Sequence, residues 1–135
     1  MIETLSVQTR GQGLYDFTQE LQQLVSRAGI DDGLCSLLLQ HTSASLLIQE
    51  NADPAVQDDL QNWLARLVKE GDSLYTHTDE GPDDMPAHIK TALTASTLSI
   101  PCANGRLALG TWQGVYVWEH RRHGSSRRIV VHVGE

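Results

Sequence analysis

Two histidines bracket a short acidic segment near the middle of the chain, which holds the densest set of side chains that could do chemistry. Between His77 and His88 the sequence places four carboxylates and two prolines. Imidazoles and carboxylates bind metal ions and transfer protons near neutral pH. Asp83 or Asp84 is placed to cap a helix, so His88 should project from its first turn and His77 from the preceding loop. The alternative is a solvated acidic loop before a capped helix, but we expect the two histidines to be functional.

A second polar segment interrupts two apolar stretches earlier in the chain. Residues 34–39 and 44–48 are predicted to be buried strands, and His41, Thr42 and Ser43 lie in the break between them. Polar groups in such a position must face a cleft or find buried hydrogen-bond partners. We therefore predict that Thr42 and Ser43 bind substrate. A histidine such as His41, taken alone, is more often a hydrogen-bonded structural residue than a metal ligand.

The three histidines would define a metal site if the fold brings them together. His41, His77 and His88 around one ion would leave a position free for water or substrate. Asp84 or a neighbouring carboxylate could orient a histidine ring, ligate an ion such as Mg²⁺, or act as the catalytic acid or base. The spacing matches no local metal-binding motif, so the sequence predicts a divalent ion, zinc or magnesium, without deciding which.

Glu119 is predicted to lie on the buried face of a strand, because it alternates with the valines of the segment 113–120. A buried carboxylate needs a partner or a shifted pKa, and such groups are frequent in active sites. Glu119 is therefore a candidate catalytic residue. The alternative is a structural salt bridge to Arg127 or Arg128 across a predicted hairpin.

Four arginines gather around that predicted hairpin, at positions 121, 122, 127 and 128. In a chain with a net charge of −7 they could form a local pocket for a small anionic substrate, with Arg127 as a binding residue. The alternative is the ordinary charged end of a hairpin.

The segment Gly110–Gly114 precedes the same strand and carries two further candidates. Trp112 could form an aromatic wall of a substrate pocket, and Gln113 could donate and accept hydrogen bonds to a ring-containing ligand. We predict Trp112 as a substrate-binding residue and Gln113 as a catalytic one. The alternative is a bulge with a packed tryptophan.

The remaining pattern predicts the elements that position these groups. Helices are expected after Asp16, from Pro54 with Trp63 on the buried face, and from about Met85. Asn104–Gly105 is a strong hairpin signal. Further strands are predicted over residues 2–9, 96–102, 106–109, 113–120 and 127–133. Consecutive strands joined by tight turns pair antiparallel, so we expect an α+β fold in one domain that spans residues 1–135.

Composition excludes several classes of protein. The chain has 135 residues, 40 % hydrophobic and 20 % charged, which is typical of one globular domain. Its acidic balance argues against nucleic acids and anionic membranes as partners. No leader and no membrane-spanning stretch is evident, so we expect a cytoplasmic protein. Cys35 and Cys102 are predicted to be buried free thiols.

A face that is buried against a partner chain is suggested by the large aromatic side chains of Tyr116, Trp112 and Trp118.

Four parts of the chain, taken together, form a pattern that is specific for one protein family. They are His41–Ala44, Glu50–Pro54, His77 with Glu80–Gly81 and Ala87–Lys90, and Leu109–Gly114 with Glu119. They resemble the YjbQ family over essentially the whole chain. The resemblance implies a compact α+β fold around an antiparallel sheet, assembled as a homotrimer, with the three histidines in one site near a subunit boundary. This chain carries EGPDDMPAHIK where other members have a shorter version.

The resemblance also implies an activity. Members of the family are often described as thiamine-phosphate synthases, which join an aminopyrimidine methyl diphosphate to a thiazole phosphate and release diphosphate. The expectation is a metal-assisted enzyme for a small phosphorylated substrate, in which the ion and arginines neutralise the departing diphosphate. The alternatives are a hydrolase or isomerase of another phosphorylated compound, and a non-enzymatic trimeric binding protein.

Overall fold

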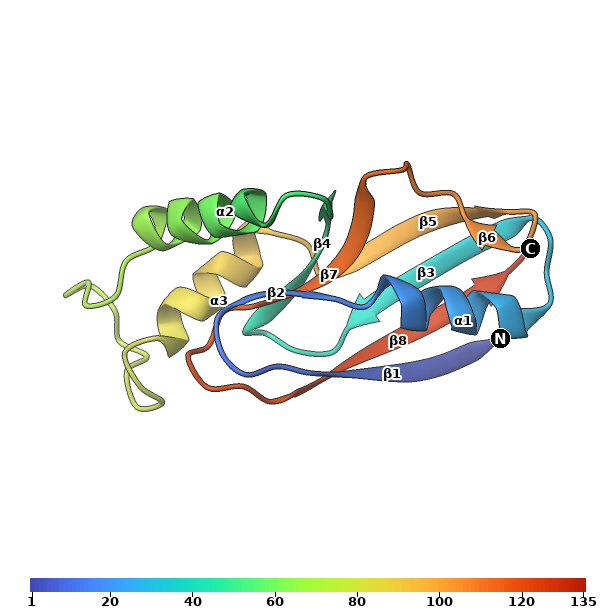
Figure 1. The fold of residues 1–135 in the computed structure, drawn as a ribbon. Helices are drawn as coiled ribbons and strands as arrows, with labels where there is room; N and C mark the ends of the chain where they lie inside the picture. Colours follow the sequence, from blue (N-terminus) through green and yellow to red (C-terminus); the bar gives the residue numbers. More distant parts are fainter.

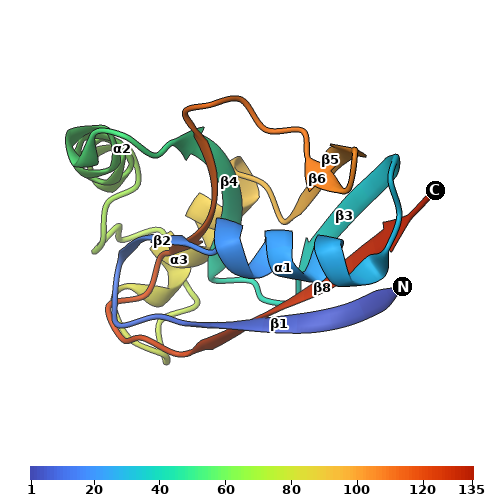
Figure 2. The ribbon, with the colours of Figure 1, turned by 45° about the vertical axis from the view of Figure 1, so that its right-hand side comes forward.

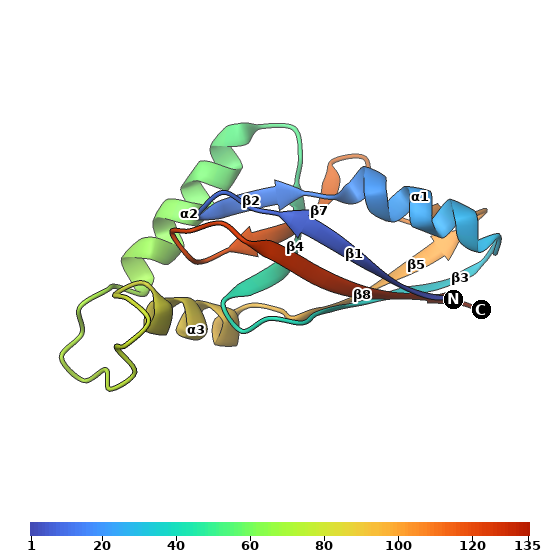
Figure 3. The same cartoon turned by 90° about the horizontal axis from the view of Figure 1, so that it is seen from below.

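Two antiparallel sheets and three helices form the molecule, and the computed structural model describes all residues from 1 to 135. The first sheet has the strand order β1-β8-β3-β5-β6, and the second has the order β2-β7-β4. Figure 1 shows α2 and α3 at the end of the molecule opposite to both chain termini, and Figure 3 confirms this arrangement from below. The elements are β1 (Ile2–Gln8), β2 (Gly13–Asp16), α1 (Thr18–Ala28), β3 (Gly33–Leu39), β4 (Ala44–Glu50), α2 (Pro54–Leu67), α3 (Asp84–Leu93), β5 (Thr97–Ala103), β6 (Arg106–Leu107), β7 (Gln113–Glu119) and β8 (Ser126–Gly134). The predicted α+β class with antiparallel sheets is confirmed.

The main core lies between α1 and the inner faces of both sheets. Leu21, Leu24 and Val25 of α1 are fully buried and belong to one cluster of 17 buried residues that includes strands of both sheets. Figure 2 shows α1 running across β8 and β3. The helix ends at Gly29, whose φ of 71° is easily adopted by glycine. The predicted apolar face of this helix is confirmed.

A second, smaller cluster joins α2 to the three-stranded sheet. Trp118 of β7 is 4 % exposed and packs with Leu64 and Val68, while its indole N–H donates to Gln61. Trp63 is 52 % exposed, so the prediction that it packs in the core was wrong. In α2 it is Leu64, the residue after Trp63, that faces the three-stranded sheet.

The turn predictions had mixed outcomes. Asn104 and Gly105 have φ angles of 54° and 75° and join β5 to β6, as the hairpin signal predicted. The expected hairpin between the last two strands was wrong, because β7 pairs with β2 and β4 whereas β8 pairs with β1 and β3. The segment between β7 and β8 is therefore a crossing from one sheet to the other.

The outer face of the five-stranded sheet carries exposed leucines. Leu34 and Leu38 of β3 are 42 % and 45 % exposed, and Leu38 lies opposite Val130 of β8 in the strand register. Tyr116 and Trp118 are buried within the chain itself, so for these two the expected burial against a partner chain was wrong. Trp112 is exposed, and the same expectation stays a prediction for it. No helix is long and apolar enough to cross a membrane.

Candidate functional site: a histidine and carboxylate cluster at the start of α3

Four side chains gather at the first turns of α3. One ligand atom from each of His77, Glu80, Asp84 and His88 lies within 4.8 Å of those of the other three. Asp84 is the centre, since its Oδ2 lies 2.8 Å from Nε2 of His77 and 3.1 Å from Nε2 of His88. Asp84 and His88 are four residues apart on one helix, which places both side chains on the same face. The predicted approach of His77 and His88 is confirmed, with 5.4 Å between their ring centroids.

Arg121 holds the carboxylates in place from the loop after β7. Its Nη1 donates to Oδ1 of Asp84 at 2.6 Å, its Nε to Oδ2 of Asp83 at 2.9 Å, and its Nη2 to the carbonyl of Glu80. Burial alone would raise the pKa of Asp84, which is 2 % exposed, but the hydrogen bond from His77 and the nearby Arg121 hold that pKa below its ordinary value. The carboxylate of Asp84 is therefore charged at neutral pH.

The ring of His88 has a defined tautomer. Its Nδ1 lies 2.9 Å from the carbonyl oxygen of Thr42, and a carbonyl only accepts, so Nδ1 carries the hydrogen. In the neutral ring, Nε2 then directs a lone pair at Oδ2 of Asp84. Two electron-rich atoms 3.1 Å apart require a cation or a proton between them. Asp84 likewise raises the pKa of His77 by its hydrogen bond, so His77 gains a proton readily.

His41 does not belong to this cluster. Its Nε2 accepts the backbone N–H of Arg128 at 2.8 Å, on the side of the β3–β4 loop that faces β8. Burial and the neighbouring Arg127 lower the pKa of His41, which keeps the ring neutral. The structure therefore brings two of the three predicted histidines together and gives the third a structural hydrogen bond.

Glu119 is fully buried beside the cluster, as predicted. Arg127 donates to both of its carboxylate oxygens, and Thr9 donates to Oε1 at 2.6 Å. Arg127 also donates to the hydroxyl and the carbonyl of Ser43. The structural alternative for Glu119 is therefore confirmed, although the two strands lie in different sheets and do not pair.

The predicted arginine pocket does not form, because three of its four members already have carboxylate partners. Arg121 pairs with Asp83 and Asp84, Arg122 with Glu70, and Arg127 with Glu119. Arg128 is exposed.

Trp112 and Gln113 lie at the opposite end of β7 from Glu119. Six residue-to-residue steps along the extended strand separate Gln113 from Glu119, a distance of about 20 Å. Gln113 accepts the backbone N–H of Gly110 at 2.7 Å, and Trp112 is 63 % exposed. The structure does not bring these two residues to the histidine cluster. The predicted roles of Thr42 and Ser43 stay predictions, but both residues lie beside the cluster.

Two buried polar residues near the cluster escaped the sequence analysis. His120 is 1 % exposed and lies 2.8 Å from the hydroxyl of Ser45, and burial lowers its pKa to about 3. Lys90 is 4 % exposed, and burial lowers its pKa as well. Lys90 falls three residues after Ala87 on the buried face of α3, so the helical period contained a signal for its burial.

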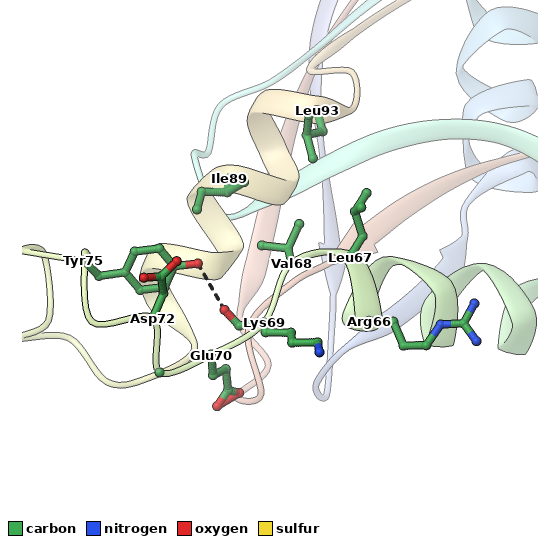
Figure 4. Close-up of a pocket in the computed structure, with 10 residues that line it drawn as sticks. Arg66, Leu67, Val68, Lys69, Glu70, Asp72, Tyr75, Ile89 and Leu93 are labelled. Carbon is green, nitrogen blue, oxygen red and sulfur yellow. Dashed lines mark hydrogen bonds between the residues drawn. The ribbon is translucent and has the colours of Figure 1, made fainter.

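Two hollows lie next to the cluster. One of about 320 Å³ is lined by His77, Met85 and Tyr75. It shares Tyr75 with a larger hollow of about 730 Å³, where Val68 and Ile89 line the gap between α2 and α3, as Figure 4 shows. A small molecule could therefore approach His77 from the side of α2.

The fold and the cluster define an α+β protein with a candidate metal-binding group of two histidines and two carboxylates. The chain belongs to the family described as "UPF0047 protein YjbQ-like", which it matches over residues 3–135. It is 51 % identical to the UPF0047 protein sll1880 of Synechocystis over 97 % of this chain and 89 % of that one, and 44 % identical to the UPF0047 protein YjbQ of Escherichia coli O157:H7 over 95 % and 93 %. A crystal structure of a YjbQ/UPF0047 protein from Clostridium acetobutylicum superposes with a TM-score of 0.89 at 32 % identity, covering 98 % of this chain and 99 % of that one. The family resemblance is thereby confirmed.

The expected activity is corrected by the same comparisons. The relatives carry family designations without an activity, and the Clostridium acetobutylicum protein is called uncharacterized. The expectation of a thiamine-phosphate synthase, or of another enzyme for a phosphorylated substrate, was therefore wrong. Membership of this family does not assign a reaction to the chain.

The buried pair of Glu119 and Arg127 gives a stability prediction. Glu119→Gln leaves the Arg127 guanidinium buried without a counter-charge, so it should lower the free energy of unfolding by about 3–5 kcal/mol in urea denaturation. The matched control is Glu3→Gln, which breaks the exposed pair with Arg27 and should cost no more than about 1 kcal/mol. The double variant Glu119→Gln/Arg127→Met should be more stable than Glu119→Gln alone. Equal costs for the two single changes would contradict the buried pair.

His120 gives a prediction for pH. Its folded-state pKa of about 3 is below its ordinary value of 6.5, so the unfolded chain binds the extra proton between these values. The contribution of neutral His120 is complete above pH 6.5 and is lost as pH falls, at up to about 1.4 kcal/mol per pH unit. His120→Gln should remove this dependence, so its stability difference from the wild type should narrow by about 2 kcal/mol between pH 7 and pH 5. Parallel curves for the two proteins in this range would contradict a buried neutral imidazole.

Proposed function

We propose that this protein binds one divalent transition-metal ion through His77, Asp84 and His88, with Glu80 as an exchangeable fourth ligand. The observation that supports the proposal is the shared position of Asp84 Oδ2, which both histidine Nε2 atoms approach within 3.1 Å. A hydrogen on Nδ1 of His88 leaves its Nε2 free to ligate. An ion there would replace the proton that the metal-free cluster needs.

The donor set fits a zinc-like ion better than magnesium. Zinc accepts imidazole nitrogen and carboxylate oxygen at about 2.0–2.2 Å, and ligand atoms around a tetrahedral ion then lie roughly 3.3 Å apart. The observed separations of 2.8 and 3.1 Å from Asp84 need only small side-chain adjustments. Magnesium prefers six oxygen ligands, whereas half of this group is nitrogen.

The surrounding residues act as supports for the proposed ligands. The Thr42 carbonyl fixes the ring of His88, and Arg121 fixes the second oxygen of Asp84, which are the contacts that orient ligands in metal sites. The side chains of His77 and Glu80 are 48 % and 63 % exposed, so the site is open on their side. An ion bound there could exchange Glu80 for water or a small ligand and would make that water more acidic.

Metal titration tests the proposal. His88→Ala and Asp84→Asn should each weaken Zn²⁺ binding more than the roughly 10–100-fold that loss of a supporting contact costs, because each removes a direct ligand. The measurement is competitive titration with a chromophoric chelator. The matched control is His41→Ala, which removes an imidazole outside the cluster and should leave the affinity unchanged.

The opposite result for these variants would decide against the proposal. A large loss with His41→Ala, or an unchanged affinity with His88→Ala, would show that the ion is held elsewhere. Binding should also weaken as pH falls, since protons compete for His77 and His88.

We also propose that the chain assembles as a homotrimer through the outer face of the five-stranded sheet. The exposed side chains of Leu34 and Leu38, with Val130 beside them, form an apolar strip on that face. Light scattering after gel filtration should give three times the chain mass of 14.9 kDa. Leu38→Lys should shift the protein toward smaller species, whereas the control Leu74→Lys, at a side chain that is 84 % exposed in the loop after α2, should not. A monomer in the wild type would contradict this proposal.

A further inference from the structure

Lys90 is a buried residue whose side-chain amine has no partner in the chain. Its side chain is 4 % exposed, yet none of the salt bridges in the structure includes it and none of the hydrogen bonds uses its Nζ. The neighbouring acidic residues are taken: Glu70 pairs with Arg122, and Asp83 pairs with Arg121. No side-chain nitrogen or oxygen that is itself buried lacks a hydrogen-bond partner, so the Nζ of Lys90, which has none, is open to solvent at the tip of an otherwise buried side chain. An ammonium in this position can receive an anion that arrives from solvent.

A small pocket gives such an anion access to Lys90. It has a volume of about 270 Å³ and lies between the end of α2 and α3, where it is lined by Gln12, Ala65, Val68, Lys69, Glu70 and Lys90. Figure 4 shows Lys69 and Glu70 on the segment that follows α2, at the edge of the larger hollow that they also line. The pocket adjoins the larger hollow, with which it shares Val68, Lys69 and Glu70, but it contains no residue of the histidine cluster.

The charge around the pocket favours a singly charged ligand. Arg122 compensates Glu70, which leaves the ammonium groups of Lys90 and Lys69 as the charges without partners. The side-chain amide of Gln12 donates to the carbonyl of His120 and can offer a second hydrogen. Ala65 and Val68 add an apolar wall. The one nearby guanidinium, which would suit a phosphate, is already occupied by Glu70.

We propose that this pocket is a binding site for a small monocarboxylate, whose carboxylate accepts hydrogen bonds from Lys90 and whose short apolar body lies against Ala65 and Val68. A volume just below that of drug-sized sites has room for a small ligand such as acetate or pyruvate. Lys69, at the exposed side of the pocket, adds long-range attraction. The site does not depend on the proposed metal ion, because no cluster residue lines it.

The chain offers a direct spectroscopic test, since Lys69 and Lys90 are its only lysines. Protein labelled with ¹³C at the lysine ε carbons therefore gives two side-chain signals, one from the proposed site and one from an exposed control. Acetate and pyruvate are titrated into metal-free protein at constant ionic strength, with chloride as the replaced anion. We expect saturable movement of the Lys90 signal and a smaller shift of the Lys69 signal. Movement of Lys69 alone, or of neither signal, would overturn the proposal.

Variants of the two lysines, and a comparison with inorganic phosphate, test which residue and which class of anion are involved. Lys90→Met keeps the length of the side chain and removes its charge, so it should abolish the rise in melting temperature that carboxylate gives the wild type by mass action. Lys69→Met should retain a reduced rise. A stabilisation that persists in Lys90→Met would place the anion elsewhere, and a tighter response to inorganic phosphate than to either carboxylate would overturn the assignment of ligand class.

Discussion

The ion pair between Arg121 and the two carboxylates that open α3 is the interaction on which the candidate site depends. Asp83 and Asp84 are both nearly inaccessible to water, and such carboxylates stay charged only when cations and hydrogen bonds replace the lost solvent. Arg121 meets this requirement with three donors, two to these carboxylates and one to the carbonyl of Glu80. The same contacts fix the start of α3 against the end of β7, and thereby the direction in which His88 projects.

A polar interior surrounds this ion pair and distinguishes this end of the molecule from the apolar core under α1. Glu119 with Arg127 and His120 with Ser45 are both buried at the end of β7, where consecutive side chains point to opposite faces of the three-stranded sheet. Buried networks of this kind stabilise little in net terms, since desolvation offsets most of the attraction. They do penalise any rearrangement that would leave one member unpaired, and so they hold Ser43 of the β3–β4 loop against Arg127 of β8 and Glu119 of β7.

Local signals in the sequence predicted the parts of the structure that local physics decides. The apolar face of α1, the Asn104–Gly105 turn and the burial of Glu119 follow from periodicity and turn chemistry. The approach of His77 to His88 was also predictable, because both lie near the start of one helix, although neither Asp83 nor Asp84 caps it by a side-chain hydrogen bond as expected. What failed depended on tertiary pairing: β7 and β8 look like a hairpin from spacing alone, yet they join different sheets. His41 was predicted to belong to the site because of its residue type. In the structure its ring nitrogen instead accepts a hydrogen bond from the backbone N–H of Arg128. Arg121 acquires its importance from carboxylates that are distant in sequence, which no local pattern reports.

The central claim is that the two histidine Nε2 atoms converge on one oxygen of Asp84 in order to hold a cation. Anomalous diffraction from crystals soaked in Co²⁺, recorded on both sides of the cobalt absorption edge, locates such an ion without assumptions about its ligands. We expect one strong peak within bonding distance of His77, Asp84 and His88. A peak beside His41, or full-occupancy cobalt that contacts none of the three, would contradict the claim.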